Sequence, residues 1–447
     1  MQSIDAPGTI RPNDRSRKTP AIHTGDLSIM DALPFDYSDY EPKGDKKNSE
    51  FFEEYLPKIY ARRAKTGVND LVGRMKAVVI QVETGDGVPT MAELHRMTPN
   101  RYHSSYISGT HKFHVLHNRP EFPAVILMEP LSDSYEDYIK RLNVLYPLSR
   151  QKPNTRYVGE VFHCADTADL QKTLEAQSIR FDYPGDTEND VFTSKGIVFS
   201  TPSDFTGNRI GYSNHDFNDP DSLALGERVE LTEDEKASLQ DGIAFAEQHG
   251  LNELMLGYDH MATRILAGER EDAILEFQTM VPYYFWGAYN ISDMNSSTNV
   301  NRCPIVSDDK QSPAKVFTAN NTPSFVNSFE NLPMPTEDFV RNYGRRMHHM
   351  AVEILDGDHP SNQKNVDYVV GLLGQQGIPF LAHVVGECKD SPDLKQIFSK
   401  HSKHTLLITE YIERCKAFDG FFTKSNVAAL TEAAGKDERY QHGHVFD

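Results

Sequence analysis

The chain has few cysteines and no long apolar run. Its cysteines are scattered over 447 residues and form no Cys-x-x-Cys pair, which argues against a disulfide framework and against a thiolate zinc site. No apolar stretch approaches the ~20 residues of a membrane-spanning helix, and residues 1–17 lack the apolar core of a signal peptide. We therefore expect a cytoplasmic protein without a membrane partner, and four reduced, mostly packed thiols: Cys164, Cys303, Cys388 and Cys415.

Positive charge is also scarce. The chain has 46 Lys and Arg against 65 Asp and Glu, which gives a net charge of −19. Phosphate groups would be repelled by this balance, so we expect no nucleic-acid partner. Hydrophobic residues make up 38% and charged residues 25%, which is ordinary for a globular protein and unlike a disordered one. The length is enough for two or three domains.

The order of the predicted elements indicates a lead segment and two α+β domains. Residues 1–70 form an N-terminal extension, rich in Pro, Asp, Ser and Lys at first, and we expect order to begin near Phe51. Short β-branched runs alternate with helical patterns over 71–215. A polar segment and one helix over 216–250 link this domain to a second series of strands and helices over 251–447.

Turn residues and hydrophobic periodicity place the individual elements. A capping box from Thr232 to Glu235 opens the helix of the linker. The stretch 290–301 is dense in Asn and Ser and is predicted to be a loop. The predicted strands are 75–82, 123–128, 158–163, 196–200, 255–265, 347–355, 394–399 and 405–414, and the predicted helices are 135–145, 168–178, 232–250, 269–281, 365–376 and 426–434.

Two short segments of the second domain are alike. His260 and His349 each begin the pattern His-Met-Ala-x-x-Ile, and each is predicted to lie at the start of a strand followed by a helix. Equivalent strands of a duplicated module would direct both imidazoles into one shared cavity. With a strand period of two, Ala262 and Arg264 share the face of His260, whereas His348 points away from the face of His349. The pattern therefore favours His260 and His349 as a pair of ligands.

An acidic residue interrupts an apolar strand face near the C-terminus. Alternation over 405–414 puts Glu410 between Ile408 and Ile412. A carboxylate on an apolar face is costly to bury unless it is paired or binds a metal. Two imidazoles and one carboxylate form the facial triad of non-haem iron(II) oxygenases, with open coordination positions. The alternatives are histidines that are simply hydrogen-bonded in the core or at the surface, and a salt bridge between Glu410 and Arg414.

Five segments after Met255 resemble those of one enzyme family, in the same order. Together they make the C-terminal half similar to the catalytic half of the 4-hydroxyphenylpyruvate dioxygenase family, in the vicinal-oxygen-chelate superfamily, of which this chain would be a divergent member. The N-terminal half shows only architectural similarity. The segments are Tyr258-Asp259-His260-Met261, His348-His349-Met350-Ala351, Leu394-Lys395-Gln396-Ile397-Phe398-Ser399-Lys400, Glu410-Tyr411-Ile412-Glu413-Arg414 and Phe422-Thr423-Lys424-Ser425-Asn426-Val427-Ala428-Ala429-Leu430.

The resemblance implies a fold and a set of site residues. The fold would be α+β, with tandem vicinal-oxygen-chelate modules (βαβββ) that form two open barrel-like domains, the C-terminal one catalytic. Iron(II) would be bound by His260, His349 and Glu410, and the C-terminal helix would gate the site. The residues that would contact the substrate are Gln396, Phe398, Phe422, Asn426 and Asn321, the last by a partial match to the family's Asn-Glu-Pro segment.

The activity that the resemblance implies is oxidative decarboxylation and hydroxylation of a 2-oxo acid by dioxygen. The family's reaction converts 4-hydroxyphenylpyruvate to homogentisate in tyrosine catabolism. Thr423 and Ser425 stand where the family has glycines, so the substrate pocket departs more than the ligand set does. The alternatives are a different 2-oxo acid, another metalloenzyme of the same fold (an isomerase or a ring-cleaving dioxygenase) and a binding module without chemistry. The expected partners are a small 2-oxo acid and dioxygen, and a homo-oligomer is compatible with the sequence.

Overall fold

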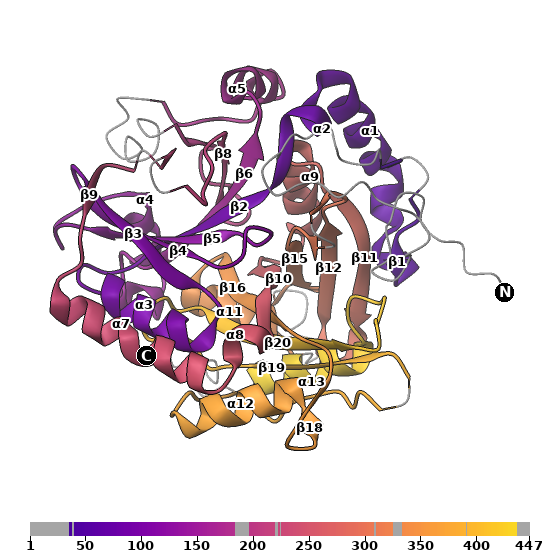
Figure 1. The fold of residues 1–447 in the computed structure, drawn as a ribbon. Helices are drawn as coiled ribbons and strands as arrows, with labels where there is room; N and C mark the ends of the chain where they lie inside the picture. The colour runs from indigo at the N-terminus through magenta and orange to yellow at the C-terminus, as the bar shows by residue number, and fades with distance from the viewer. Residues whose placement is uncertain are drawn as a thin grey trace.

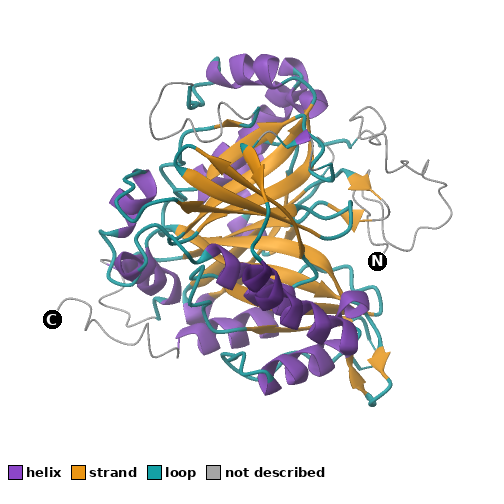
Figure 2. Cartoon of the chain, turned by 60° about the vertical axis from the view of Figure 1, so that its left-hand side comes forward, coloured by secondary structure: helices purple, strands orange, loops and turns teal. Residues whose placement is uncertain are grey.

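Two large sheets organise the described part of the chain. The computed structural model describes residues 35–37, 40–183, 196–219, 222–223, 225–307, 310–324, 333–389 and 391–435. There are two eight-stranded sheets, and in Figure 1 the sheet of the N-terminal half is mostly indigo and magenta, while that of the C-terminal half runs from rose through orange to yellow. In Figure 2 the strands occupy the middle of the molecule and most helices lie outside them. Among the described residues, none of the helices has both the length and the apolarity to cross a membrane.

The N-terminal sheet has the order β7-β8-β6-β2-β5-β4-β3-β9. Helix α3 follows the long strand β2, and helix α5 follows the long strand β6. The elements of this half are α1 (Glu50–Thr66), α2 (Val68–Leu71), β2 (Val72–Gln81), α3 (Gly87–Met97), β3 (Arg101–Ser108), β4 (His111–His117), β5 (Ala124–Pro130), α4 (Tyr138–Asn143), β6 (Arg156–Cys164), α5 (Thr167–Glu175), β7 (Val198–Phe199), β8 (Arg209–Ser213) and β9 (Glu227–Val229).

The C-terminal sheet has the order β1-β11-β12-β15-β10-β16-β20-β19 and curls into a half-barrel. Its elements are β1 (Lys43–Gly44), β10 (Met255–Arg264), α9 (Arg270–Met280), β11 (Tyr284–Ile291), β12 (Ser296–Arg302), β15 (Ala314–Asn320), α11 (Pro335–Tyr343), β16 (Arg346–Ile354), α12 (Asn365–Gln375), β19 (Asp393–Phe398), β20 (Ile408–Cys415) and α13 (Lys424–Gly435). Helices α7 (Glu233–Gln248) and α8 (Leu251–Leu254) precede it, and β13 (Val306–Ser307), β14 (Lys310–Gln311), β17 (Asp358–His359) and β18 (Gln363–Lys364) form two short hairpins.

The two halves repeat the same pairing pattern. Strand β2 pairs parallel with β5 and antiparallel with β6, as β10 pairs parallel with β15 and antiparallel with β16. Strand β6 then pairs parallel with β8, as β16 pairs parallel with β20. Each half is therefore itself a pair of modules joined along its two central strands. The expectation of an α+β fold built from tandem βαβββ-type modules is confirmed.

Apolar packing and one buried ion pair join the halves. Phe162 on β6 meets Tyr283, which precedes β11, edge to face with ring centroids 5.8 Å apart. Lys315 on β15 forms an ion pair with Glu160 on β6, and both side chains are almost fully buried. A buried charge is costly unless it is paired, so each of these side chains needs the partner that the other half supplies.

The Asn- and Ser-rich stretch 290–301 is not a loop, so that prediction is wrong. Most of it belongs to β11 and β12, with a short turn between them. The amides of Asn299 and Asn301 on β12 are buried and donate to backbone carbonyls of β15, at 3.3 Å to Phe317 and 3.2 Å to Lys315. Polar side chains are satisfied inside the sheet in this way, and that requires a neighbouring strand that composition cannot reveal.

The chain is already ordered before Phe51, so the expectation that order begins near Phe51 is wrong. Strand β1 pairs parallel with β11. Phe35 stacks on Tyr284 with ring centroids 4.5 Å apart, and the Tyr40 hydroxyl donates to the Trp286 carbonyl at 2.8 Å. Aromatic burial therefore holds the described part of the lead segment against the outer strands of the C-terminal sheet.

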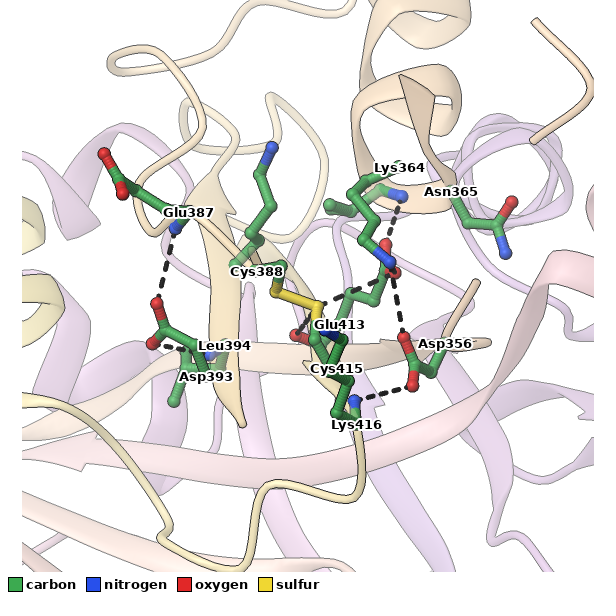
Figure 3. Close-up of a disulfide and its surroundings, with 12 residues drawn as sticks. Asp356, Lys364, Asn365, Glu387, Cys388, Asp393, Leu394, Glu413, Cys415 and Lys416 are labelled. Atoms are coloured by element: carbon green, nitrogen blue, oxygen red, sulfur yellow. Dashed lines mark hydrogen bonds and ion pairs between the residues drawn. A yellow bond between two sulfur atoms is a disulfide. The ribbon is translucent and has the colours of Figure 1, made fainter. Parts of the chain in front are cut away.

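The expectation of four reduced thiols is wrong for one pair. Cys388, in the loop before β19, forms a disulfide with Cys415 at the end of β20 (Figure 3), while Cys164 and Cys303 are free and buried. Asp356 and Glu413 lie next to Cys415, but its sulfur is bonded to Cys388 and offers no thiolate for a metal. Disulfides persist mainly in oxidising compartments, so the cytoplasmic location loses one of its arguments and stays a prediction.

Candidate metal centre

Three neighbouring strands of the C-terminal sheet bring the expected ligands together. Strand β16 lies between β10 and β20. Along one rung of the sheet His260, Ala351 and Glu410 are register partners, and two residues further along β10 His349 lies opposite Ala262. Each histidine thus faces the alanine of the other segment, because the two His-Met-Ala segments run antiparallel. Both histidines lie within their strands, which corrects the expectation that they begin them.

The three donor atoms form a small triangle. Glu410 Oε2 lies 3.0 Å from His260 Nε2 and 3.1 Å from His349 Nε2, and the two Nε2 atoms are 3.3 Å apart. Ligands at right angles around an ion with bonds of about 2.1 Å are separated by about 3.0 Å. The donor set therefore fits a divalent cation bound on one face, with its other positions turned away from the three side chains.

The carboxylate of Glu410 is buried and only partly satisfied. It is 1% exposed, and its Oε1 has no hydrogen-bond partner among the described residues. Burial alone would raise the pKa of Glu410, but the two histidines outweigh it and lower the pKa to about 2. Burial alone would lower the pKa of His260, but Glu410 and Asp259 raise it to about 9, whereas burial keeps the pKa of His349 below its usual value. Glu410 thus holds Oε2 between two imidazoles and has a second buried oxygen, Oε1, without a partner among the described residues, an arrangement that a bound metal would complete.

A second layer of side chains orients His260. Asp259 Oδ1 lies 2.7 Å from His260 Nδ1, and Arg414 donates to both Asp259 oxygens at 2.8 Å each. This contact puts the proton on Nδ1 and leaves Nε2 as the metal-facing acceptor. The alternative of a salt bridge between Glu410 and Arg414 is not the arrangement found, because Arg414 is engaged with Asp259.

Two β-bulges explain why residues adjacent in sequence act at one site. The register of β10 against β16 shifts between Tyr258 and His260, which makes Asp259 an extra residue. It shifts again next to His349, which makes His348 an extra residue of β16. A bulge breaks strict alternation, so Asp259 contacts the ring of His260 and His348 Nδ1 lies 2.7 Å from His349 Nδ1. The expectation that His348 points away from this site is therefore wrong.

A cavity of about 520 Å³, open solvent at its mouth included, lies against this centre. His349 and Glu410 form part of its wall, and Phe398 lies beside His349 with ring centroids 4.7 Å apart. Three of the expected substrate-contacting residues line it, namely Gln396, Phe398 and Phe422. The rest of its wall comes from β10, β12, β15, β16, α11 and α13: Arg264, Ser296, Thr298, Val316, Thr318, Thr336, His348, Val427, Leu430 and Thr431.

The other two expected substrate contacts lie elsewhere. Asn426 is buried on α13, where its amide donates to the Leu394 carbonyl of β19 at 2.9 Å, so it docks the helix instead of facing the cavity. Asn321 is exposed and donates to Asn290 at 2.7 Å. No strand pattern constrained the direction of either side chain, so their contact with a substrate stays a prediction.

Sequence reasoning missed three polar side chains of this region. Asp259 and Arg414 support the ligands, and their adjacency to His260 and Glu410 in the family-like segments was the available signal. Arg264 lines the cavity, and alternation had already placed it on the face of His260. A positively charged residue on the same strand face as a candidate ligand was the available signal that Arg264 belongs to this region.

The fold and site define the chain as a protein with the vicinal-oxygen-chelate fold, built from tandem modules. Among solved structures it is similar to a variant of 4-hydroxymandelate synthase from Streptomyces coelicolor, with a TM-score of 0.54 and 13% identity over 81% of this chain and 98% of that chain. A xylose isomerase-like TIM barrel/4-hydroxyphenylpyruvate dioxygenase fusion protein gives a TM-score of 0.49 and 11% identity over 82% of this chain and 53% of that chain.

A third solved structure, 2,2',3-trihydroxybiphenyl 1,2-dioxygenase from Sphingomonas wittichii strain RW1, gives a TM-score of 0.41 and 10% identity over 76% of this chain and 90% of that chain. No family model matches the sequence, and no curated protein is a significant match to it. At these identities the likeness to solved structures concerns the fold.

Proposed function

We propose that this chain is an iron(II)-dependent dioxygenase that oxidatively decarboxylates and hydroxylates a 2-oxo acid. One observation carries the proposal: the Nε2 atoms of His260 and His349 and Oε2 of Glu410 converge within 3.0–3.3 Å of one another, beside a cavity. Two imidazoles and one carboxylate on one side of an ion are the donor set of non-haem iron(II) oxygenases. The likeness in fold to 4-hydroxymandelate synthase supports the same class of enzyme.

The residues of this chain would bind the metal and hold it ready. When bound, iron(II) supplies the redox chemistry that lets dioxygen react with the 2-oxo acid. His260 and His349 bind as neutral imidazoles, so the proton that His260 carries in the metal-free protein leaves when metal binds. Asp259 then accepts the remaining Nδ1 proton in a hydrogen bond, and Arg414 keeps Asp259 ionised.

The cavity wall would position the substrate and exclude water. Phe398 and Phe422 present apolar surface next to the two ligand histidines, with ring centroids 4.7 Å and 5.2 Å from them. The side-chain oxygen of Gln396 is buried without a hydrogen-bond partner among the described residues, which leaves it available to a substrate donor. Helix α13 covers the cavity with Val427 and Leu430, in agreement with a gate that closes over a bound substrate.

The reaction consumes one 2-oxo acid and one dioxygen and releases carbon dioxide, with one oxygen atom in the new carboxylate and one in the new hydroxyl group. For 4-hydroxyphenylpyruvate, the substrate suggested by the sequence resemblance, the product is homogentisate. No separate 2-oxo acid cosubstrate enters. In this proposal the catalytic domain is residues 251–447. It follows an N-terminal extension over residues 1–70, a non-catalytic domain over 71–215 and a linker with one helix over 216–250.

The test begins without oxygen. Iron(II) and a 2-oxo acid are added to the protein, and chelation should give a visible charge-transfer band. Dioxygen is then admitted, and carbon dioxide release and oxygen uptake should follow in equal amounts. A band without carbon dioxide would favour a binding module. Turnover of a substrate without carbon dioxide release would favour an isomerase or a ring-cleaving dioxygenase, and no band with any 2-oxo acid would remove the proposal.

A further inference from the structure

A polar wall of the cavity is formed by β10, β15 and β12, on the side of the sheet away from β20, which carries Glu410. Arg264, Thr318 and Thr298 are register partners on one rung across β10, β15 and β12, and all three line the cavity. Val316 of β15, which also lines the cavity, lies two residues closer to the candidate ligands, opposite Ala262. The cavity wall thus has a metal-binding part with His349 and Glu410, an apolar part with Val316 and a second polar part with Arg264.

The distance between the metal-binding part and Arg264 follows from the strands. Arg264 lies four residues beyond His260 on β10. At about 3.3 Å per residue the two positions are about 13 Å apart along the strand, whereas His349, the ligand histidine that lines the cavity, pairs with Ala262 and is about 7 Å along the strand from the position of Arg264. A molecule about 7–13 Å long could therefore contact a candidate ligand and Arg264 at once.

The guanidinium of Arg264 is held by its surroundings. It is 7% exposed, donates to the Pro335 carbonyl at 3.1 Å and lies 5.1 Å from the centroid of the Phe339 ring, both on α11. Among the described lining residues it is the single Lys or Arg, and the hydroxyls of Ser296, Thr298, Thr318, Thr336 and Thr431 line the same cavity. A fixed guanidinium with adjacent hydroxyls is suited to recognise a carboxylate through two parallel hydrogen bonds.

We propose that Arg264, assisted by Thr298 and Thr318, binds a second carboxylate at the far end of the substrate. This inference rests on the proposed function and names its substrate class: 2-oxo acids that carry an additional carboxylate opposite the metal-binding end. The far-end group of 4-hydroxyphenylpyruvate is a neutral phenol, so the preferred substrate would be an acidic counterpart of it. Arg264 is then a specificity-determining residue that touches the substrate, remote from the reacting atoms.

The test compares two ligands that differ by one carboxylate. The iron(II)-loaded protein is titrated without oxygen with phenylpyruvate and with 4-carboxyphenylpyruvate, and the charge-transfer band reports binding of each. The wild type should bind the carboxylated acid roughly 10- to 100-fold more tightly, as expected for a charge-assisted contact. Arg264→Met should remove this preference, and Arg264→Lys should restore part of it.

The outcomes separate this inference from the proposed function. No band with these two acids or with any other 2-oxo acid would overturn the proposed function, and this inference with it. A band with both acids at equal affinity in the wild type would overturn this inference alone, as would a preference that survives in a folded Arg264→Met protein. If Arg264→Met fails to fold, Thr318→Val should lower the affinity for 4-carboxyphenylpyruvate more than that for phenylpyruvate, and equal effects on both acids would count against the anion site.

Discussion

Arg414 on β20 donates two hydrogen bonds of 2.8 Å to the carboxylate of Asp259 on β10. Asp259 in turn contacts His260 Nδ1 at 2.7 Å. Burial would raise the pKa of Asp259, but Arg414 and His260 outweigh it and hold that pKa well below its usual value. Asp259 on β10 and Arg414 on β20 therefore set the tautomer and the orientation of the His260 ring.

The first prediction concerns this support. Asp259→Asn keeps the shape of the side chain but removes the charge that stabilises His260. We expect iron(II) affinity to fall by roughly 10- to 100-fold, as is typical for a residue behind a metal ligand. Competition with a calibrated chelator measures it. Glu269→Gln removes a partly exposed ion pair with Arg345 and should leave the affinity unchanged. An unchanged affinity in Asp259→Asn would show that the contact does not support the site.

The part of the site that could be predicted is the part that obeys a regular strand period. His260, His349 and Glu410 lie on regular register positions of β10, β16 and β20, so alternation and the family-like segments selected them correctly as a cluster. Asp259 and His348 lie at bulges. A bulge depends on the register between two strands, and no local pattern in one strand specifies it.

Contacts between segments that are far apart in sequence explain the other differences between the predictions and the structure. The disulfide joins Cys388 and Cys415, which are 27 residues apart in sequence. Without a spacing motif, only the approach of the loop before β19 to the end of β20 brings them together. The stretch 290–301 is dense in strand-averse residues, yet β11 and β12 form because their neighbours satisfy the buried amides. Tertiary contacts override composition in both cases.

The second prediction is acid sensitivity of the N-terminal half. His95 and His111 are buried, and burial lowers the pKa of each to about 4. In the unfolded chain their pKa is about 6.5, so between these values the unfolded state takes up protons first. Stability is therefore full above about pH 6.5 and falls as the pH drops toward 4, by at most about 1.4 kcal/mol per pH unit for each histidine.

Urea unfolding over this pH range checks the second prediction. His95→Gln and His111→Gln should each make the decline shallower, whereas His383→Gln, at an exposed position, should leave it as in the wild type. If neither of the first two substitutions changes the pH dependence, burial of neutral histidines is not its cause.

The third prediction concerns the disulfide. Cross-links over a separation of this length stabilise by about 3–4 kcal/mol through the unfolded state. Reductant should therefore lower the free energy of unfolding by a similar amount, measured with urea. A Cys388→Ser, Cys415→Ser double variant should show the lower stability and no response to reductant. Alkylation of four thiols in denatured, unreduced protein would contradict the cross-link.

The fourth prediction separates docking of α13 from substrate contact. Asn426→Ala removes the hydrogen bond to the Leu394 carbonyl, which we expect to destabilise the helix by about 1–2 kcal/mol. Hydrogen exchange of α13 should become faster, and exchange in β10 and β16 should not change. Ser425→Ala, at an exposed neighbouring position, is the control. A lower affinity for the 2-oxo acid with no change in exchange would instead indicate direct contact with the substrate.

The last prediction tests whether Glu410 is a ligand or a structural residue. Glu410→Gln keeps the size of the side chain but removes a buried charge. Because the two histidines outweigh the cost of burying that charge, the metal-free variant should be moderately less stable than the wild type. Iron(II) stabilises the wild type because it binds the folded state alone, and that increase in melting temperature should disappear in the variant. Glu353 also lies on β16 and forms an ion pair with Lys310 of β14. Glu353→Gln breaks that pair and should keep the increase in melting temperature with iron(II). A large loss of stability in metal-free Glu410→Gln, with the iron response retained, would mean that the carboxylate holds the two histidines for packing and that the metal lies elsewhere.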